Sequence, residues 1–168
     1  MPLGMPSRQL FAVRSIFSAV RFASSVVSAM SALPPSHLAF PVDDLEEAKR
    51  FFCELLGCSV GRTSDRWADF NFFGHQISAH LVDAADRIEV NTVDGDAVPV
   101  RHFGVILTLG EWRALRLKLE TSGAEFIIEP KVRFEGQAGE QATMFVKGPS
   151  RNAIEFKAFD DAQRIFER

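Results

Sequence analysis

The sequence has few cysteines, no acidic residue before Asp43, and no uncharged apolar run of about 18 residues. Its two cysteines, Cys53 and Cys58, are too far apart for a Cys-x-x-Cys redox pair, and no second pair accompanies them to build a zinc site. We interpret both as reduced structural residues, one on a helix and one on the strand that follows. Without a long apolar run there is no candidate membrane span, so no membrane partner is expected.

The composition indicates a folded chain of modest size. With 168 residues, of which 46% are hydrophobic and 24% charged, the chain can bury the core of one compact domain or of two small fused modules. After residue 32 there are 16 basic side chains against 22 acidic ones. This acidic balance argues against nucleic acid as the main partner.

The first 32 residues differ from the rest. Arg8, Arg14 and Arg21 alternate with apolar residues, serine occurs seven times and no acid is present. This composition is typical of an organelle-targeting segment, with the mitochondrion favoured over the plastid. Two alternatives stay open: a disordered tail, or translation that starts at Met30, which would leave the protein in the cytoplasm.

A strand, a helix and three strands are predicted in the first half of the chain. The strand covers residues 37–42, and Asp43 with Glu46 three residues later indicates the start of a helix that stops at Gly57. Alternating apolar residues and a Gly74-His75 corner predict the strands that follow, at residues 58–62, 66–73 and 76–82.

The second half repeats this order. A strand at 102–109 precedes a helix that begins with the Thr108 to Glu111 capping signal and stops at Gly123. From the first histidine to the helix-ending glycine there are 20 residues in one copy and 21 in the other. Further strands are predicted at residues 125–128, 141–147 and 152–159.

This duplication predicts an α+β fold of tandem βαβββ modules, forming a cupped, open, eight-stranded mixed sheet with the helices on the outside. The expected domain covers residues 33–160 and a C-terminal tail covers 160–168. Within the domain we place module one at 36–82, a linker at 83–99, module two at 100–159 and a long, potentially functional loop at 129–140.

Both modules begin with a histidine whose place in its strand is the same. Because side chains in a strand alternate between faces, His37 and His102 lie on the faces opposite to Leu38, Phe40, Phe103 and Val105. The same alternation sets His80 and Glu155 on that face of their own strands. The neighbours that leave room beside the first two histidines are Ala39, Pro41, Gly104 and Ile106.

Two imidazoles and a carboxylate form a familiar metal-binding set. His37, His102 and Glu155 match the facial triad of non-haem Fe(II) enzymes, which leaves positions open for substrate and oxygen. One divalent ion is therefore expected, with Fe(II) favoured and Mn, Zn, Ni or Co as alternatives. His80 is a candidate catalytic base, a further ligand, or a residue that supports a ligand.

The chain resembles the vicinal oxygen chelate superfamily, which includes glyoxalase I, extradiol dioxygenases, fosfomycin-resistance enzymes and bleomycin-binding proteins. The resemblance covers residues 36–159. Within them, five stretches resemble a predicted extradiol-dioxygenase subgroup: HLAFPVDDLEEAKRFF, FNFFGHQISAHL, RHFGV, FIIEP and GEQATMF…IEFKAF. The resemblance implies the metal triad named above. It also implies a homodimer, and whether the ligands of one site come from one chain or from two stays open.

The resemblance favours a metal-dependent dioxygenase, an oxidoreductase, acting on a small molecule with adjacent oxygens. A glyoxalase-like isomerase or lyase is the enzymatic alternative, although glyoxalase I carries a glutamate on its fourth strand where His80 is expected here. A metal-free ligand-binding protein is the other alternative, with an aromatic cavity that includes Phe72. Lys131 and Arg133 are candidates to contact an anionic group of the substrate.

One turn departs from the family pattern. Before the last strand, relatives carry a sequence like Asp-Pro-x-Gly-Asn, and this chain has Arg151 in the place of that glycine. The turn position calls for a residue that tolerates positive φ, so a modest loss of stability is expected there.

Overall fold

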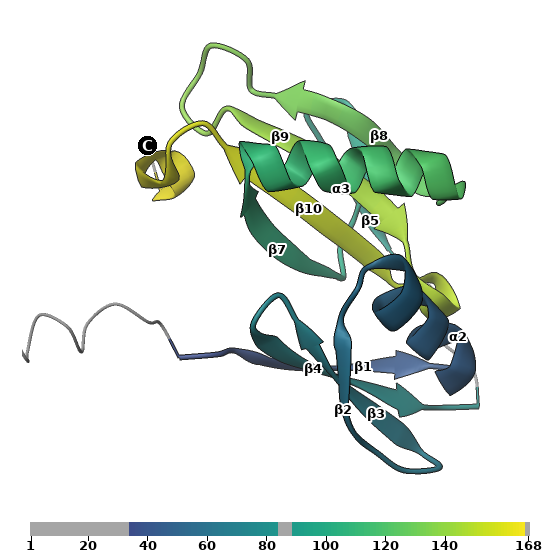
Figure 1. The fold of residues 1–168 in the computed structure, drawn as a ribbon. Helices are drawn as coiled ribbons and strands as arrows, with labels where there is room; N and C mark the ends of the chain where they lie inside the picture. Colours follow the sequence, from purple (N-terminus) through teal and green to yellow (C-terminus); the bar gives the residue numbers. More distant parts are fainter. Residues whose placement is uncertain (1–33, 84–88, 167–168) are drawn as a thin grey trace, which may run out of the picture. The chain divides into compact units, whose positions relative to one another are not determined.

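The computed structural model describes residues 34–83 and 89–166. The predicted α+β fold of two βαβββ modules is confirmed, with the helices outside the sheets (Figure 1). The eight strands of the modules divide between two four-stranded sheets. The predicted targeting segment, residues 1–32, lies outside the described residues.

Module one has the strand order β1-β4-β3-β2, with β1 parallel to β4 and at the edge of the sheet among the described strands. Its helix α2 continues directly as the π-helical segment η1. The elements are β1 (His37–Val42), α2 (Leu45–Lys49), η1 (Arg50–Leu55), β2 (Ser59–Thr63), β3 (Trp67–Phe72) and β4 (His75–Leu81).

Two local signals in module one are shifted by one residue from the prediction. Asp44, not Asp43, caps α2, because its carboxylate accepts the N–H groups of Glu46 and Glu47. The β3–β4 corner is Phe73-Gly74, not Gly74-His75. Both corner residues have positive φ, as a tight two-residue hairpin turn requires.

Module two repeats the topology, with the order β7-β10-β9-β8 and β7 parallel to β10. The predicted capping box of Thr108 and Glu111 is present, and Gly123 ends the helix at φ 71°. The elements are β7 (His102–Thr108), α3 (Leu109–Ser122), β8 (Phe126–Arg133), β9 (Gln141–Lys147), η2 (Pro149–Arg151), β10 (Ala153–Phe159) and η3 (Ala162–Phe166).

The segment predicted as a linker between the modules contains a hairpin. Strands β5 (Val90–Val93) and β6 (Asp96–Pro99) pair around Asp94-Gly95, where both residues have positive φ. Asp-Gly is a strong signal for this turn. The predicted loop at 129–140 is also shorter than expected, because β8 extends to Arg133 and leaves residues 134–140 as the loop.

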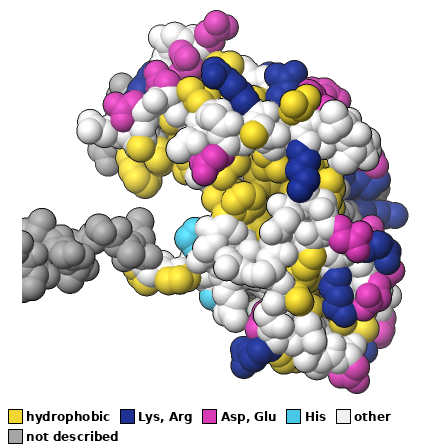
Figure 2. Space-filling view, viewed as in Figure 1, with side chains coloured by type: hydrophobic (Ala, Val, Ile, Leu, Met, Phe, Trp, Pro, Cys, Tyr) yellow, Lys and Arg dark blue, Asp and Glu magenta, His cyan; other side chains and the backbone are white. Residues whose placement is uncertain are grey.

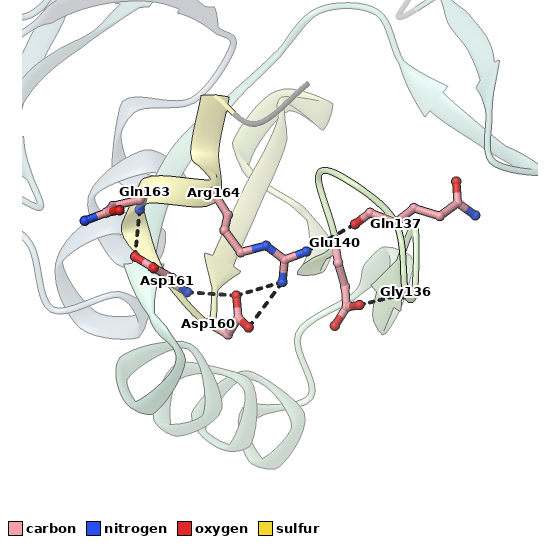
Figure 3. A network of polar contacts seen from close by, with 7 residues as sticks. All are labelled: Gly136, Gln137, Glu140, Asp160, Asp161, Gln163 and Arg164. Atoms are coloured by element: carbon pink, nitrogen blue, oxygen red, sulfur yellow. Dashed lines mark hydrogen bonds and ion pairs between the residues drawn. The ribbon is translucent and has the colours of Figure 1, made fainter.

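That remaining loop is held by the C-terminal segment η3 (Figure 3). The guanidinium of Arg164 donates to the carbonyl oxygen of Gln137 at 3.2 Å and pairs with Asp160. Within the loop, Gly136 N–H donates to Glu140 Oε2 at 2.6 Å. The chain after Arg133 is therefore fixed at several points.

The bulky faces of the first strands lie in a common aromatic core. Phe40 of β1 lies 5.0 Å from Phe103 of β7 between ring centroids, and Phe72 lies 6.3 Å from Phe156 of β10. Helix α3 joins this core through Trp112, whose Nε1 donates to the Phe156 carbonyl at 2.9 Å. The core explains why the histidines of β1 and β7 face the other side.

Polar contacts connect the modules beside this core, among them a hydrogen bond from the Ser150 hydroxyl to the Asp43 carboxylate. Asn152 Nδ2 donates to the carbonyl of Pro41 at 2.8 Å, and Asp43 N–H donates to Ser150 Oγ at 2.7 Å. Ser150 and Arg151 have φ of 52° and 63°, which confirms the predicted positive φ at Arg151. The turn η2 thus places two strained residues where β1 ends.

Both cysteines are free, as predicted; Cys58 is buried, and desolvation raises the pKa of its thiol to about 11. Its thiol is therefore poorly reactive at neutral pH. Among the helices in the described ranges, none combines the length and apolar character that a membrane crossing needs.

Candidate metal centre

His102 and Glu155 lie side by side on the face of module two that is opposite to the aromatic core. In the parallel ladder of β7 and β10, Glu155 is opposite Gly104, two residues beyond His102 on the same face. His102 Nε2 and Glu155 Oε2 are 3.4 Å apart. Two ligands that share one ion at about 2.1 Å lie roughly 3 Å apart, so this pair fits one metal ion.

The backbone fixes the tautomer of His102. Its Nδ1 lies 2.6 Å from the carbonyl oxygen of Pro99, and since a carbonyl can only accept, Nδ1 carries the hydrogen. In the neutral ring, Nε2 then presents its lone pair toward Glu155. A ligand histidine whose second nitrogen donates to a backbone carbonyl is a usual arrangement in metal sites.

Glu155 is a buried carboxylate with both oxygens occupied. Its side chain is 5% exposed; Oε1 accepts from the Thr143 hydroxyl at 2.7 Å, and Oε2 lies 3.2 Å from Lys157 Nζ. Burial raises the pKa of Glu155, but the hydrogen bonds from His102 and Thr143 and the charge of Lys157 outweigh it, so the pKa is lowered. The side chain of Glu155 is therefore an ionised carboxylate at neutral pH.

The carboxylate of Glu155 also shifts the pKa of His102. The hydrogen bond with Glu155 holds the pKa of His102 above its usual range, against the effect of burial and with further help from the Pro99 carbonyl. A metal ion competes with this proton, since ligand imidazoles bind in the neutral form.

Gly104 makes the close approach of the two strands possible. A Cβ atom at this position would lie 1.6 Å from the backbone oxygen of Glu155. No side chain fits there without separating β7 from β10. Gly104 was predicted to leave room beside His102, and in the structure its lack of a side chain lets the backbone of Glu155 approach.

His37 is not brought to this pair within one chain. It opens β1 with an exposed side chain, and among residues 34–83 and 89–166 no three metal-binding side chains are close enough to hold an ion. Strand β1 and strand β7 are both sheet edges, each with a histidine at its start. A hollow of about 490 Å³ is lined by residues 38–41 of β1 and by residues 100–103 at the start of β7, and Figure 2 shows an apolar hollow on one face of the molecule.

The register of module one also places His80. Ser78, opposite Ala39, occupies the position that Glu155 holds opposite Gly104, and His80 lies two residues further along, opposite Pro41 and Trp67. His80 is exposed and on the predicted face. By this register Ser78, not His80, is the module-one counterpart of Glu155. His80 as catalytic base stays a prediction.

A carboxylate is nevertheless present one strand away. Asp69 of β3 is opposite Ser78 and only 5% exposed, and it accepts hydrogen bonds from Ser78 Oγ at 2.5 Å and Gln76 Nε2 at 3.2 Å. Arg62 Nη2 lies 3.3 Å from its second oxygen. Both oxygens of the Asp69 carboxylate thus have partners within module one.

The two predicted substrate-binding cations lie on β8. Lys131 Nζ is 2.5 Å from Oδ2 of Asp96, and Arg133 Nη2 contacts the same oxygen. Arg133 is only 4% exposed, so it is not a loop residue in solvent. The hydrogen bond from Lys131 is the main reason why the pKa of Asp96 is lowered.

Phe72, the predicted aromatic contact of a ligand, is a core residue. Its side chain is 2% exposed and packs against Phe52, Phe103 and Phe156. It faces the core because Phe72 has the opposite alternation to Asp69 and Asn71 along β3. In the described chain it offers no surface to a small molecule.

Sequence reasoning missed three residues that shape the site. Lys157 and Thr143 follow the same alternation as Glu155 and could have been found by extending it along β10 and β9. Asp96 carried no comparable signal, because its partners on β8 are more than 30 residues away. All three contact a predicted site residue directly.

Comparison with known proteins identifies the family. The model of the Glyoxalase/Bleomycin resistance protein/Dioxygenase superfamily matches residues 35–156, and the chain belongs to this superfamily. A glyoxalase/bleomycin resistance protein/dioxygenase from Alicyclobacillus acidocaldarius is 34% identical, with a TM-score of 0.68, over 79% of this chain and 95% of that one.

More distant structures share the fold. The fosfomycin resistance protein FosX from Listeria monocytogenes is 15% identical, with a TM-score of 0.60, over 82% of this chain and 99% of that one. Lactoylglutathione lyase from Agrobacterium tumefaciens is 14% identical, with a TM-score of 0.55, over 77% and 95%. A comparison with curated protein sequences gives no significant match.

Proposed function

We propose that this protein is a metal-dependent enzyme that acts on a small molecule with adjacent oxygens, most simply an Fe(II) dioxygenase of the extradiol type. The observation that carries the proposal is the His102–Glu155 pair, with one nitrogen of His102 committed to Pro99 and the other directed at a buried carboxylate. A binding protein that only sequesters a ligand has no need of this arrangement.

In this proposal His37 comes from a second copy of the chain. The support is that β1 and β7 are both unpaired sheet edges and that His37 is exposed and outside the His102–Glu155 pair. A two-fold arrangement that brings β1 of one copy to β7 of the other would complete two identical sites.

When bound, the divalent ion supplies Lewis-acid stabilisation of charge on the substrate oxygens. The chain's own residues have separate tasks. Pro99 orients His102, Thr143 holds Glu155, and Lys157 adds positive charge beside the ligand oxygen. His80, on the same face of module one, is the proposed base that takes a proton from the substrate.

A complementation experiment tests the metal site and the dimer together. The full chain is reconstituted without oxygen with Fe(II) and separately with Mn²⁺, Zn²⁺, Ni²⁺ and Co²⁺, and bound metal per chain is measured. His37→Gln and Glu155→Gln should each abolish binding, and His75→Gln, on a histidine that contacts the backbone N–H of Ser36, should not.

The two inactive variants are then unfolded and refolded together. If sites form across two chains, mixed dimers regain one intact site, and bound metal returns to about one quarter of the wild-type value. No recovery would place all ligands in one chain, and wild-type metal content in Glu155→Gln would remove the metal proposal. With a metal established, oxygen uptake with catechols separates a dioxygenase from a glyoxalase-like lyase, which turns over without oxygen.

A further inference from the structure

The hairpin of β5 and β6 lies against the site face of module two. Val98 and Val93 pack with Ile128 and Phe145, which lie on β8 and β9. Strand β6 reaches two parts of the site: the Pro99 carbonyl accepts from His102, and Asp96 contacts Lys131 and Arg133. One end of this four-residue strand therefore lies at His102 and the other end lies at Lys131 and Arg133, on the same face of module two.

Positive charge exceeds negative charge at this face. Lys131 and Arg133 share a single oxygen of Asp96, so the one carboxylate leaves an excess charge of about +1. Lys157 lies in the same cross-strand row, since it and Lys131 are both register partners of Thr143. A divalent ion at the neighbouring Glu155 would increase this excess, and an anionic molecule would reduce it.

The buried guanidinium of Arg133 has an unused donor. Its Nε is buried and has no hydrogen-bond partner, although the side chain is only 4% exposed. An unpaired buried donor is costly, and it suits an acceptor that the described chain does not supply. The guanidinium lies over the ring of Phe145 at 5.9 Å, and the same ring is 5.1 Å from the ring of His102. The unused donor and the metal-binding pair thus flank one aromatic side chain.

We infer that Lys131 and Arg133 form an anion subsite of the substrate pocket, in which the Asp96 carboxylate stands in for a carboxylate, phosphate or phosphonate group of the substrate. The inference rests on the proposed function only in assigning the metal end to His102 and Glu155. It narrows the substrate class to small molecules with chelating oxygens at one end and an anionic group at the other.

The length of β6 sets the scale of such a molecule. Asp96 and Pro99 are three residue steps apart on an extended strand, which corresponds to about 10 Å. The anionic group and the chelating oxygens are separated by a distance of this order, as in a substituted aromatic ring with an acidic side chain. Lys157, whose Nζ lies 3.2 Å from Glu155 Oε2, would face the chelating end of the molecule.

Anion binding to metal-free protein tests the subsite independently of the metal. The full chain is kept in EDTA, and its melting temperature is followed with methylphosphonate, with acetate and with chloride at equal ionic strength. Asp96→Asn should lower the melting temperature in chloride, because Arg133 loses its partner, and one of the two other anions should restore it. We expect that anion to bind Asp96→Asn at least about tenfold more tightly than wild type, since the internal competitor is gone.

Matched lysine variants provide the control. Lys131→Met should reduce anion affinity of the otherwise wild-type chain about fivefold or more, a result that holds even if Asp96→Asn fails to fold. Lys147→Met removes an exposed lysine of β9 that pairs with Glu125 and should leave anion affinity unchanged. The larger effect of methylphosphonate or acetate identifies the anionic group.

Two results would overturn the inference. One is an Asp96→Asn protein that is less stable in chloride and gains no more from methylphosphonate or acetate than from added chloride. The other is equal anion affinity in Lys131→Met and Lys147→Met. Since neither measurement involves a metal, a protein that binds anions but no metal would retain the subsite while the proposed enzyme function fails.

Discussion

The hydroxyl of Thr143 donates a hydrogen bond of 2.7 Å to Oε1 of Glu155, and both side chains are buried. This contact occupies one oxygen of the carboxylate, so Oε2 is the oxygen that faces His102 and Lys157. Thr143 therefore decides which way the carboxylate points. A single methyl-for-hydroxyl exchange can test this role because it changes almost no volume.

Thr143→Val should weaken metal binding by about 10- to 100-fold, as removal of a group that orients a ligand usually does. Loss of the buried hydrogen bond should also cost about 1–3 kcal/mol in the free energy of unfolding. Metal titration and urea denaturation measure the two effects. Thr121→Val, at an exposed hydroxyl of α3 bonded to the Leu117 carbonyl, is the control and should leave metal affinity unchanged.

Gly104→Ala should destabilise the protein by about 3 kcal/mol or more, because the added Cβ would overlap the Glu155 carbonyl oxygen and separate β7 from β10. Bound metal should fall with it, since the same displacement moves His102 away from Glu155. Gly110→Ala is the matched control. Its Cβ meets no atom within 4 Å in α3, so up to about 1 kcal/mol of added stability is expected.

In metal-free protein the His102–Glu155 pair should make stability depend on pH. The raised pKa of His102 contributes stability that is full below its usual value of 6.5 and is lost as the pH rises through the folded pKa. The lowered pKa of Glu155 contributes stability that is present above its usual value of 4.5 and is lost as the pH falls through the folded pKa.

The contribution of the pair is thus largest between about pH 4.5 and 6.5. Urea denaturation in EDTA, compared between wild type and His102→Gln, should give the greatest difference in free energy of unfolding inside this range. His75→Gln serves as the control for a histidine outside the pair. A difference for His102→Gln that stays constant from pH 4 to pH 8 would contradict the expectation.

Arg151→Gly should stabilise the protein by about 0.5–1 kcal/mol, because Arg151 has φ of 63° and glycine adopts this conformation without the clash of a Cβ atom. Thermal denaturation measures the change. Arg151→Ala keeps the Cβ and so separates relief of the backbone from loss of the long side chain. Equal stability of the glycine and alanine variants would show that the backbone conformation carries no cost.

How far the sequence predicts this molecule depends on the range of the interactions involved. The shared face of His102, Gly104 and Glu155 followed from alternation, which is local and strict within a strand. The end of β8 was missed because Pro130 and charged neighbours resemble a loop. Proline is tolerated there since β8 is an edge strand, and its place at the edge depends on the tertiary fold.

Contacts between distant segments lay outside local patterns. Asp96 meets Lys131 and Arg133 only because a hairpin folds back over the sheet, and nothing in its flanking sequence specifies these partners. The residue of module one that corresponds to Glu155 also differs from the expected one. The family resemblance indicated His80 as the fourth-strand site position, whereas the pairing of Ala39 with Ser78 makes Ser78 the counterpart of Glu155.

Pro41 gives the free edge of β1 a property that bears on assembly. The carbonyls of Ser36 and Val42 point to β4, so the alternating residues His37, Ala39 and Pro41 direct their backbone groups outward. At Pro41 there is no N–H to donate, and its carbonyl already accepts from Asn152. A further strand therefore cannot pair along the whole of this edge, which limits the growth of a continuous sheet through β1.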